Sequence, residues 1–195
     1  MTYGTSEQDY VDPTRRDFLY IATGAAAAIG AGAFVWPFID QMNPSAATRA
    51  LASVRVNVAG LEEGMSMTVK WRGKPVFLRK PTAAELEEAD RVPIGDLKDP
   101  VAQNANLAED QPASLGNRLI VPEGGTQDDA MLVMIGVCTH LGCVPLGQQG
   151  DYDGWFCPCH GSHYDTAGRI RRGPAPENLH IPPLAFVGET MVQIG

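Results

Sequence analysis

The hydropathy pattern begins with an uncharged apolar run of 22 residues, from 18 to 39. A helix of that length rises about 33 Å, which is enough to cross a hydrocarbon core of roughly 30 Å. The run is rich in Ala and Gly rather than Leu, so its hydropathy is modest. It predicts one N-terminal transmembrane anchor helix over residues 18–40.

Beyond this helix, apolar and polar residues alternate over short stretches, a pattern typical of strands with one buried face. Thr82 and Glu85 have the spacing of a capping box and predict a short helix that ends near Asp90. An apolar run leads directly into Cys138 and predicts a buried strand. The predicted strands cover residues 54–58, 65–71, 75–78 and 131–137, and Arg72-Gly73-Lys74 joins the second to the third as a hairpin.

Two segments lack such a pattern. Asn43-Pro44 breaks a helix, and the residues that follow are small and polar, so residues 41–53 are predicted to be a flexible hinge linker. Residues 96–118 are rich in Asn, Gln, Asp and Pro and show no core-forming pattern. We predict that they form a surface excursion.

The composition supports a turn-rich β protein, with 21 glycines and 15 prolines among 195 residues. The formal net charge of −8 and a pI near 4.9 argue against a nucleic-acid partner, which requires a basic patch. All four cysteines lie between residues 138 and 159. So tight a group indicates a metal site, a disulfide, or both.

Two arginines stand directly before the apolar run, and Thr14-Arg15-Arg16-Asp17-Phe18-Leu19 resembles a twin-arginine export signal. No Lys or Arg follows until Arg49, which predicts that the tail, residues 1–17, is cytoplasmic and that the remainder lies outside. The alternative is a signal peptide cleaved at Ala31-Gly32-Ala33. The retained anchor is the favoured interpretation.

Two short motifs each combine cysteine with histidine. The first is Cys138-Thr139-His140-Leu141-Gly142-Cys143, and the second is Cys157-Pro158-Cys159-His160-Gly161-Ser162. Two such loops can close on a metal centre from opposite sides, and thiolates with imidazoles suit zinc, copper or iron–sulfur. A structural zinc site is the alternative, although its usual spacing begins with two cysteines two to four residues apart.

Together with the arginine pair, the apolar run and Gly173-Pro174-Ala175-Pro176, these motifs resemble the Rieske iron–sulfur proteins of the cytochrome bc complex, the ubiquinol–cytochrome c oxidoreductase. The resemblance implies a mainly β fold. An antiparallel β-sandwich head would span residues 54–195, with a small cluster-binding subdomain at about 136–182 inserted in it. The N-terminal transmembrane helix would anchor this head.

The resemblance also implies one [2Fe–2S] cluster as the cofactor. Cys138 and Cys157 would bind one iron, and His140 and His160 the other. The two remaining cysteines, Cys143 and Cys159, would form a disulfide between the cluster loops, which agrees with export to an oxidising compartment.

Further residues receive roles in the same way. Ser162 and Tyr164 match family positions that donate hydrogen bonds to the cluster, the serine to a bridging sulfide and the tyrosine to the Cys138 sulfur. Such bonds favour the reduced, more negative state. Leu141 would cover the cluster and face a partner, and residues 173–176 would form a rigid third wall.

By resemblance, this enzyme subunit takes one electron from ubiquinol at cytochrome b and passes it to the haem of cytochrome c1, within a dimeric complex. His160 is the expected catalytic ligand, which meets the quinol and couples a proton to the electron. The chain would cross the lipid of the bacterial inner membrane once, with its head in the periplasm. The alternative is the Rieske subunit of another periplasmic oxidase, such as arsenite oxidase. Soluble oxygenase ferredoxins lack the second cysteine pair and the anchor.

Three residues near the motifs fall outside the ligand set. His163 is predicted to be a surface neighbour of the cluster loop, and His180 is predicted to be structural. Asp153 departs from the family pattern, in which glycine often stands before Gly154-Trp155, and this departure leaves the local turn open.

Overall fold

The computed structural model describes residues 14–46, 48, 52–126 and 129–195, and the chain divides into two units between residues 49 and 50. The first unit contains helix α1 (Arg15–Asp40), of which no residue is buried. Its apolar window is long enough to cross a membrane. Thr14 and Asp17 form a capping box at its start, since each side chain accepts a hydrogen bond from the other's backbone N–H.

The second unit contains three antiparallel sheets. The first has the order β1 (Val54–Asn57), β11 (Met191–Ile194), β10 (Leu184–Val187). The second has the order β2 (Ser66–Trp71), β3 (Lys74–Arg79), β5 (Met131–Ile135), β4 (Leu119–Ile120). The third has the order β6 (Leu146–Gly147), β7 (Trp155–Cys157), β8 (Ser162–Tyr164), β9 (Ile170–Arg172). The short helices are α3 (Ala83–Asp90), η1 (Ile94–Asp96) and α4 (Leu115–Arg118).

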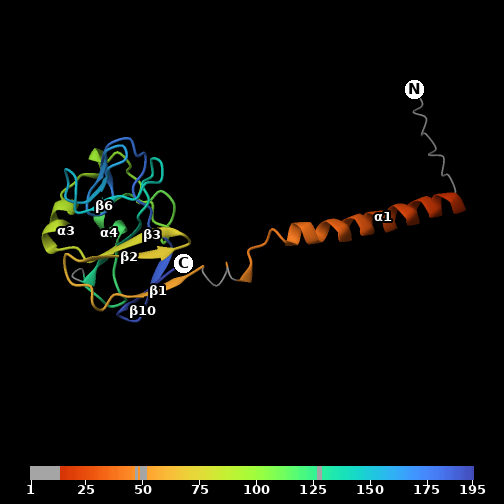
Figure 1. Ribbon diagram of the computed structural model, residues 1–195, viewed down its shortest axis with the longest axis horizontal. Coiled ribbons are helices and arrows are strands. Elements are labelled where there is room, and N and C mark those ends of the chain that lie inside the picture. The colour runs from red at the N-terminus through yellow and green to blue at the C-terminus, as the bar shows by residue number, and fades with distance from the viewer. Residues whose placement is uncertain (1–13, 47, 49–51, 127–128) are drawn as a thin grey trace, which may run out of the picture. The chain divides into compact units, whose positions relative to one another are not determined.

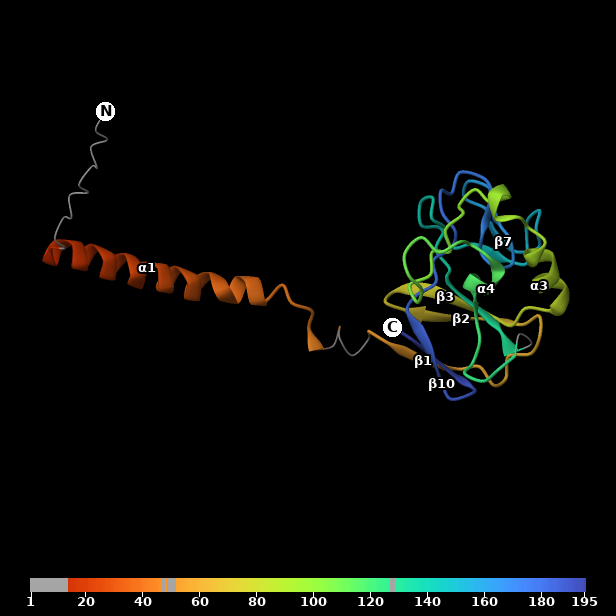
Figure 2. The same cartoon turned by 180° about the vertical axis from the view of Figure 1, so that it is seen from behind.

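The second sheet lies between the other two and is covered on both faces, as Figures 1 and 2 show. Successive side chains of β3 point to opposite faces. Val76 and Leu78 pack in one core with Val192 of the first sheet. Phe77 points into the other core and stacks on Trp155 of the third sheet, with ring centroids 4.3 Å apart. The mainly β fold expected from the sequence is confirmed. The third sheet packs on β3 through the stacked Phe77 and Trp155 rings.

The predicted local elements are also found. The four predicted strands correspond to β1, β2, β3 and β5, with ends that differ by one or two residues. Thr82 and Glu85 form the predicted capping box of α3. The third sheet occurs between β5 and β10 in the sequence, as the predicted insertion requires.

The surface excursion predicted for residues 96–118 is wrong for much of that segment, although residues 105–110 are exposed. Its buried residues include two charged side chains and three apolar ones: Asp99, Arg118, Ala102, Ala113 and Leu115. The Arg118 guanidinium donates hydrogen bonds to three backbone carbonyls, those of Ala102, Ala167 and Leu179. Buried alanines and charged side chains that bond the backbone produce no apolar periodicity, so the sequence pattern could not identify this core.

Candidate metal centre

Two loops next to strands of the third sheet bring the cysteine–histidine motifs together. The first loop (residues 136–145) follows β5, and the second loop (157–162) joins β7 to β8. Each contains a tight turn of the same design: the carbonyl of Cys138 accepts a hydrogen bond from Gly142 N–H, and that of Cys157 from Gly161 N–H. Both glycines have positive φ, 82° and 72°. The two motifs therefore present cysteine and histidine with related local geometry.

The two predicted cysteine ligands are buried free thiols, Cys138 and Cys157. The two predicted histidine ligands, His140 and His160, come from different loops, yet their ring centroids lie only 4.6 Å apart, with the planes at 89°. The Nδ1 atom of His140 is buried and has no hydrogen-bond partner within the described residues. A buried ring nitrogen without a partner is costly unless it binds something.

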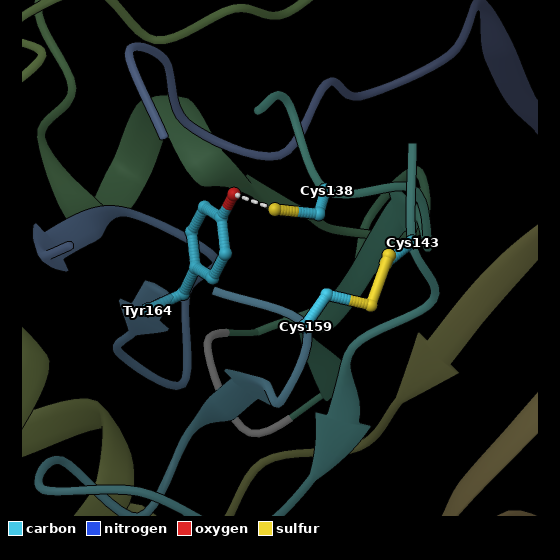
Figure 3. The surroundings of a disulfide bond; sticks show 4 residues. All are labelled: Cys138, Cys143, Cys159 and Tyr164. Atoms are coloured by element: carbon cyan, nitrogen blue, oxygen red, sulfur yellow. Dashed lines mark hydrogen bonds between the residues drawn. A yellow bond between two sulfur atoms is a disulfide. The ribbon is translucent and has the colours of Figure 1, made fainter. Parts of the chain in front are cut away.

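A disulfide joins Cys143 of the first loop to Cys159 of the second, as Figure 3 shows. It is the pair expected from the resemblance. The Cys157 sulfur lies within 4.8 Å of both disulfide sulfurs. Because two of these three sulfurs are bonded to each other, this group is not itself a three-thiolate site. The thiols left for a metal are those of Cys138 and Cys157.

The Tyr164 hydroxyl points at the Cys138 sulfur, 3.3 Å away (Figure 3). Burial and this hydrogen bond raise the pKa of Tyr164 above its usual value. Burial also acts to raise the pKa of Cys138, but hydrogen bonds, first of all from Tyr164, outweigh it and hold this pKa below its usual value. Once Cys138 is a thiolate it has no proton to give, so Tyr164 would then be the donor. The hydroxyl oxygen in turn accepts a hydrogen bond from Thr139 N–H at 3.3 Å.

Cys157 differs from Cys138 because burial leaves the pKa of its thiol raised. A bound metal would overcome this preference, since a coordinating thiol is deprotonated. The two buried sulfurs are thus unequal before any metal binds, and the hydrogen bond of Tyr164 is on the more acidic one.

Comparison with known proteins identifies the family. The families described as "Ubiquitinol-cytochrome C reductase Fe-S subunit TAT signal" and "Rieske [2Fe-2S] domain" match residues 5–45 and 98–183. The ubiquinol–cytochrome c reductase iron–sulfur subunit of Rhodobacter capsulatus is 56% identical over 183 residues, 93% of this chain and 95% of the relative. Those of Rhodospirillum rubrum and Rickettsia conorii are 51% and 44% identical, covering 94% and 98% of this chain and 93% and 98% of the relatives. The chain belongs to this family of Rieske iron–sulfur subunits.

Membership in the Rieske family sets the zinc interpretation aside, and the structure provides an independent test of the cofactor. A Rieske [2Fe–2S] cluster takes two cysteine and two histidine ligands. The loops offer two buried free thiols and two adjacent imidazoles, one with a buried, unpartnered nitrogen. The donor set therefore fits the cluster. The match to the signal family over residues 5–45 and the apolar helix α1 support a membrane-anchored Rieske subunit.

The remaining predicted site residues surround these loops. Ser162 is buried, and its Oγ accepts a hydrogen bond from Ala175 N–H at 3.2 Å. Leu141 is 70% exposed at the tip of the first loop. In the segment predicted as a third wall, Pro174 and Pro176 are exposed whereas Ala175 is buried. Their roles toward the cluster stay predictions.

The two non-ligand histidines and Asp153 lie at the edges of this Rieske site. His163 is half-buried in β8, where its Nδ1 accepts a hydrogen bond from Asp151 N–H at 3.0 Å. His180 is exposed and bonds Glu177 through Nε2. Asp153 has φ of 46°, a left-handed conformation that Asp tolerates better than most side chains and that glycine adopts freely. This explains how the turn accepts Asp where the resemblance led us to expect glycine.

Sequence reasoning missed three residues that hold the site together. Thr139 bonds the backbone of Glu177 in both directions, donating from Oγ1 to its carbonyl and accepting from its N–H. Lys98 and Asp99 bond the chain near residues 173–178. Thr139 stands between two predicted ligands, which was a usable signal. Lys98 and Asp99 lie in a polar stretch that offered none.

Proposed function

We propose that the chain is the electron-carrying subunit of a ubiquinol–cytochrome c reductase, taking one electron from ubiquinol at cytochrome b and delivering it to the haem of cytochrome c1. The observation that carries this proposal is the convergence of two buried thiols and two imidazoles from the paired loops, in a chain whose relatives have that name. When bound, the [2Fe–2S] cluster supplies a one-electron carrier of higher potential than all-cysteine clusters.

The burial of the proposed ligands distinguishes an inner side from an outer side. Cys138 and Cys157 are 2% and 1% exposed, whereas His160 is exposed and His140 is half-buried. The cysteines would thus hold the inner iron and the histidines the outer one. Leu141, which is also exposed, adds an apolar contact on the outer side. Redox partners would meet the subunit there.

His160 is the proposed catalytic residue. In His140 the buried ring nitrogen is Nδ1. If His160 likewise binds the metal through Nδ1, its Nε2 would face outward from an exposed ring. In the oxidised protein, with the His160 ring deprotonated, Nε2 would accept the hydrogen bond of the quinol hydroxyl and take its proton as the electron leaves. The ring would therefore both orient the substrate and move the proton. Ubiquinol oxidation should be slower in D₂O than in H₂O. Reduction of cytochrome c1 by the pre-reduced subunit should proceed at the same rate in both solvents. Equal rates of quinol oxidation in the two solvents would contradict this step.

The topology follows from the arginine pair and α1. The tail would lie in the cytoplasm, α1 would remain uncleaved as a single span in the bacterial inner membrane, and the head would stand in the periplasm. The linker, residues 41–53, would let the head reach both cytochrome b and cytochrome c1. The parent complex would be dimeric.

Gentle solubilisation of the membrane tests the function. The chain should co-purify with b- and c-type haems and two irons of its own, show paramagnetism only when reduced, and support cytochrome c reduction by ubiquinol. His160→Gln should abolish the signal and the activity, whereas His180→Gln, an exposed non-ligand, should retain both. Co-purification without haems would point to another periplasmic oxidase and overturn the proposal.

A further inference from the structure

The segment between β9 and β10 that contains the two prolines is held by hydrogen bonds to side chains elsewhere in the chain. In the proline segment (residues 173–177), prolines 174 and 176 have no N–H to donate. The N–H of Ala175 bonds Ser162 Oγ, and that of Glu177 bonds Thr139 Oγ1. Ser162 belongs to the second cluster loop and Thr139 to the first, so each bond joins the segment to one loop. The position of the segment is therefore coupled to both loops.

Lys98 holds the same segment from the other side. Its Nζ donates to the carbonyls of Gly173 at 2.7 Å and Ala175 at 2.8 Å, across 75 and 77 residues of sequence. The two carbonyls flank Pro174, whose ring fixes φ, so one ammonium group constrains the whole turn. Ala175 is held at both ends of its backbone, by Ser162 at the N–H and by Lys98 at the carbonyl.

Neighbouring contacts leave this turn little freedom of its own. The Asp99 carboxylate accepts a hydrogen bond from Asn178 N–H at 2.8 Å, which fixes the chain just after the segment. A Cβ on Gly173 would lie 2.6 Å from the Cα of Ser162, so the segment packs directly on the backbone of the second loop. A small shift of the turn therefore reaches Ser162.

We propose that Lys98 is a positioning residue that sets the hydrogen bond of Ser162 toward the cluster. A hydroxyl has one proton and two acceptor sites. While Ala175 N–H occupies an acceptor site of Ser162, the hydroxyl proton points elsewhere, toward the cluster side of the loop. Without Lys98 the two carbonyls of the segment lose their donor and can compete for that proton. The hydrogen bond from Ser162 that favours the reduced cluster is then weakened.

This inference rests on the proposed function, and the variants are made in the full-length chain within its membrane complex. Lys98→Met keeps the aliphatic stem but removes the donors and the charge. Lys98→Arg keeps both. Lys70→Met makes the same charge change on the exposed face of β2, where the side chain has no hydrogen bond or salt bridge within the described residues.

The midpoint potential and the spectrum of the reduced cluster are the measurements. Lys98→Met should lower the reduced-to-oxidised ratio at fixed ambient potential about threefold, which is about 30 mV at 59 mV per tenfold change. Lys98→Arg and Lys70→Met should leave it unchanged. Hydrogen exchange of the Ala175 amide should accelerate in Lys98→Met alone.

A double-mutant cycle separates positioning from simple charge. In a Ser162→Ala background, Lys98→Met should have no further effect on the potential. The proposal is overturned by an unchanged potential in Lys98→Met, by an equal shift in Lys70→Met, or by a shift that persists without the Ser162 hydroxyl. If Lys98→Met loses its cluster, Lys98→Leu, which also removes the donors and the charge, is measured against the same outcomes. Failure of the proposed function would instead be seen as no Rieske signal in the unmodified complex.

Discussion

Tyr164→Phe is the most direct test of how the protein tunes its cluster. Tyr164 is buried, and its ring lies in the core with Trp155 and Ile170. Phenylalanine keeps that ring and removes only the hydroxyl. Three interactions are lost with it: the donation to Cys138 Sγ and the acceptance from Thr139 N–H, each 3.3 Å long, and the 3.4 Å hydrogen bond with Thr139 Oγ1.

The expected shift in potential follows from the first of these bonds. A hydrogen bond to a charged group contributes about 1.5–3 kcal/mol. Both redox states receive the bond, and we assign roughly half of its energy to the difference between them, because the reduced state is the more negative. A loss of ~0.7–1.5 kcal/mol corresponds to a drop of ~30–70 mV, at 1.36 kcal/mol and 59 mV per tenfold change. The Thr139 N–H left without its acceptor would separately cost about 1–3 kcal/mol of folding stability.

Voltammetry of the intact subunit measures the potential, and denaturant unfolding measures the stability. Tyr152→Phe is the matched control, because the Tyr152 ring packs against Arg171 and its hydroxyl makes no hydrogen bond within the described chain. It should leave the potential unchanged. A Tyr164→Phe potential equal to that of the unmodified protein would refute the assignment of Tyr164 as donor to the cluster sulfur.

Three further variants test the support of the site. Cys143→Ala with Cys159→Ala opens a disulfide of sequence separation 16 and should cost about 3 kcal/mol in denaturant unfolding; an unchanged midpoint would contradict it. Arg118→Met strips three buried carbonyls of their donor and should cost about 3 kcal/mol or more, against less than about 1 kcal/mol for the exposed Arg91→Met; equal losses would count against it. Gly154→Ala would place a methyl group against the backbone of residues 164–165 and should lower cluster content measured as iron per chain; full iron content would show that the strands can separate there.

The sequence predicted those parts of the molecule that depend on local pattern. The strands that became β1, β2, β3 and β5 alternate or are wholly apolar, and the capping box of α3 is a four-residue signal. The motifs with cysteine and histidine identified the loops because each is contiguous. Such features are encoded by neighbours in the chain, so they need no knowledge of tertiary structure.

The contacts that were missed all join residues far apart in the sequence. Lys98 reaches carbonyls 75 and 77 residues away, and Arg118 bonds Ala167 and Leu179. Backbone carbonyls occur at every residue, so the sequence cannot indicate which of them a side chain will find. A polar stretch that supplies such donors has the same composition as a solvated loop. Only the fold distinguishes the two.

The two cluster loops share the same turn, and their inner and outer sides differ in exposure. This difference would separate two functions of the site. On the inner side, Tyr164 and Ser162 are buried, and they form hydrogen bonds with the Cys138 sulfur and the Ala175 backbone. Their predicted role is to shift the potential, and substitutions there would leave the outer surface unchanged. On the outer side, the exposed His160 and Leu141 can meet a partner without disturbing those bonds. The disulfide joins one loop to the other and so constrains their relative geometry, while the inner hydrogen bonds would favour the reduced state. An electron carrier with two docking partners would use both sides, the inner one to set its resting potential and the outer one to present His160 to the quinol.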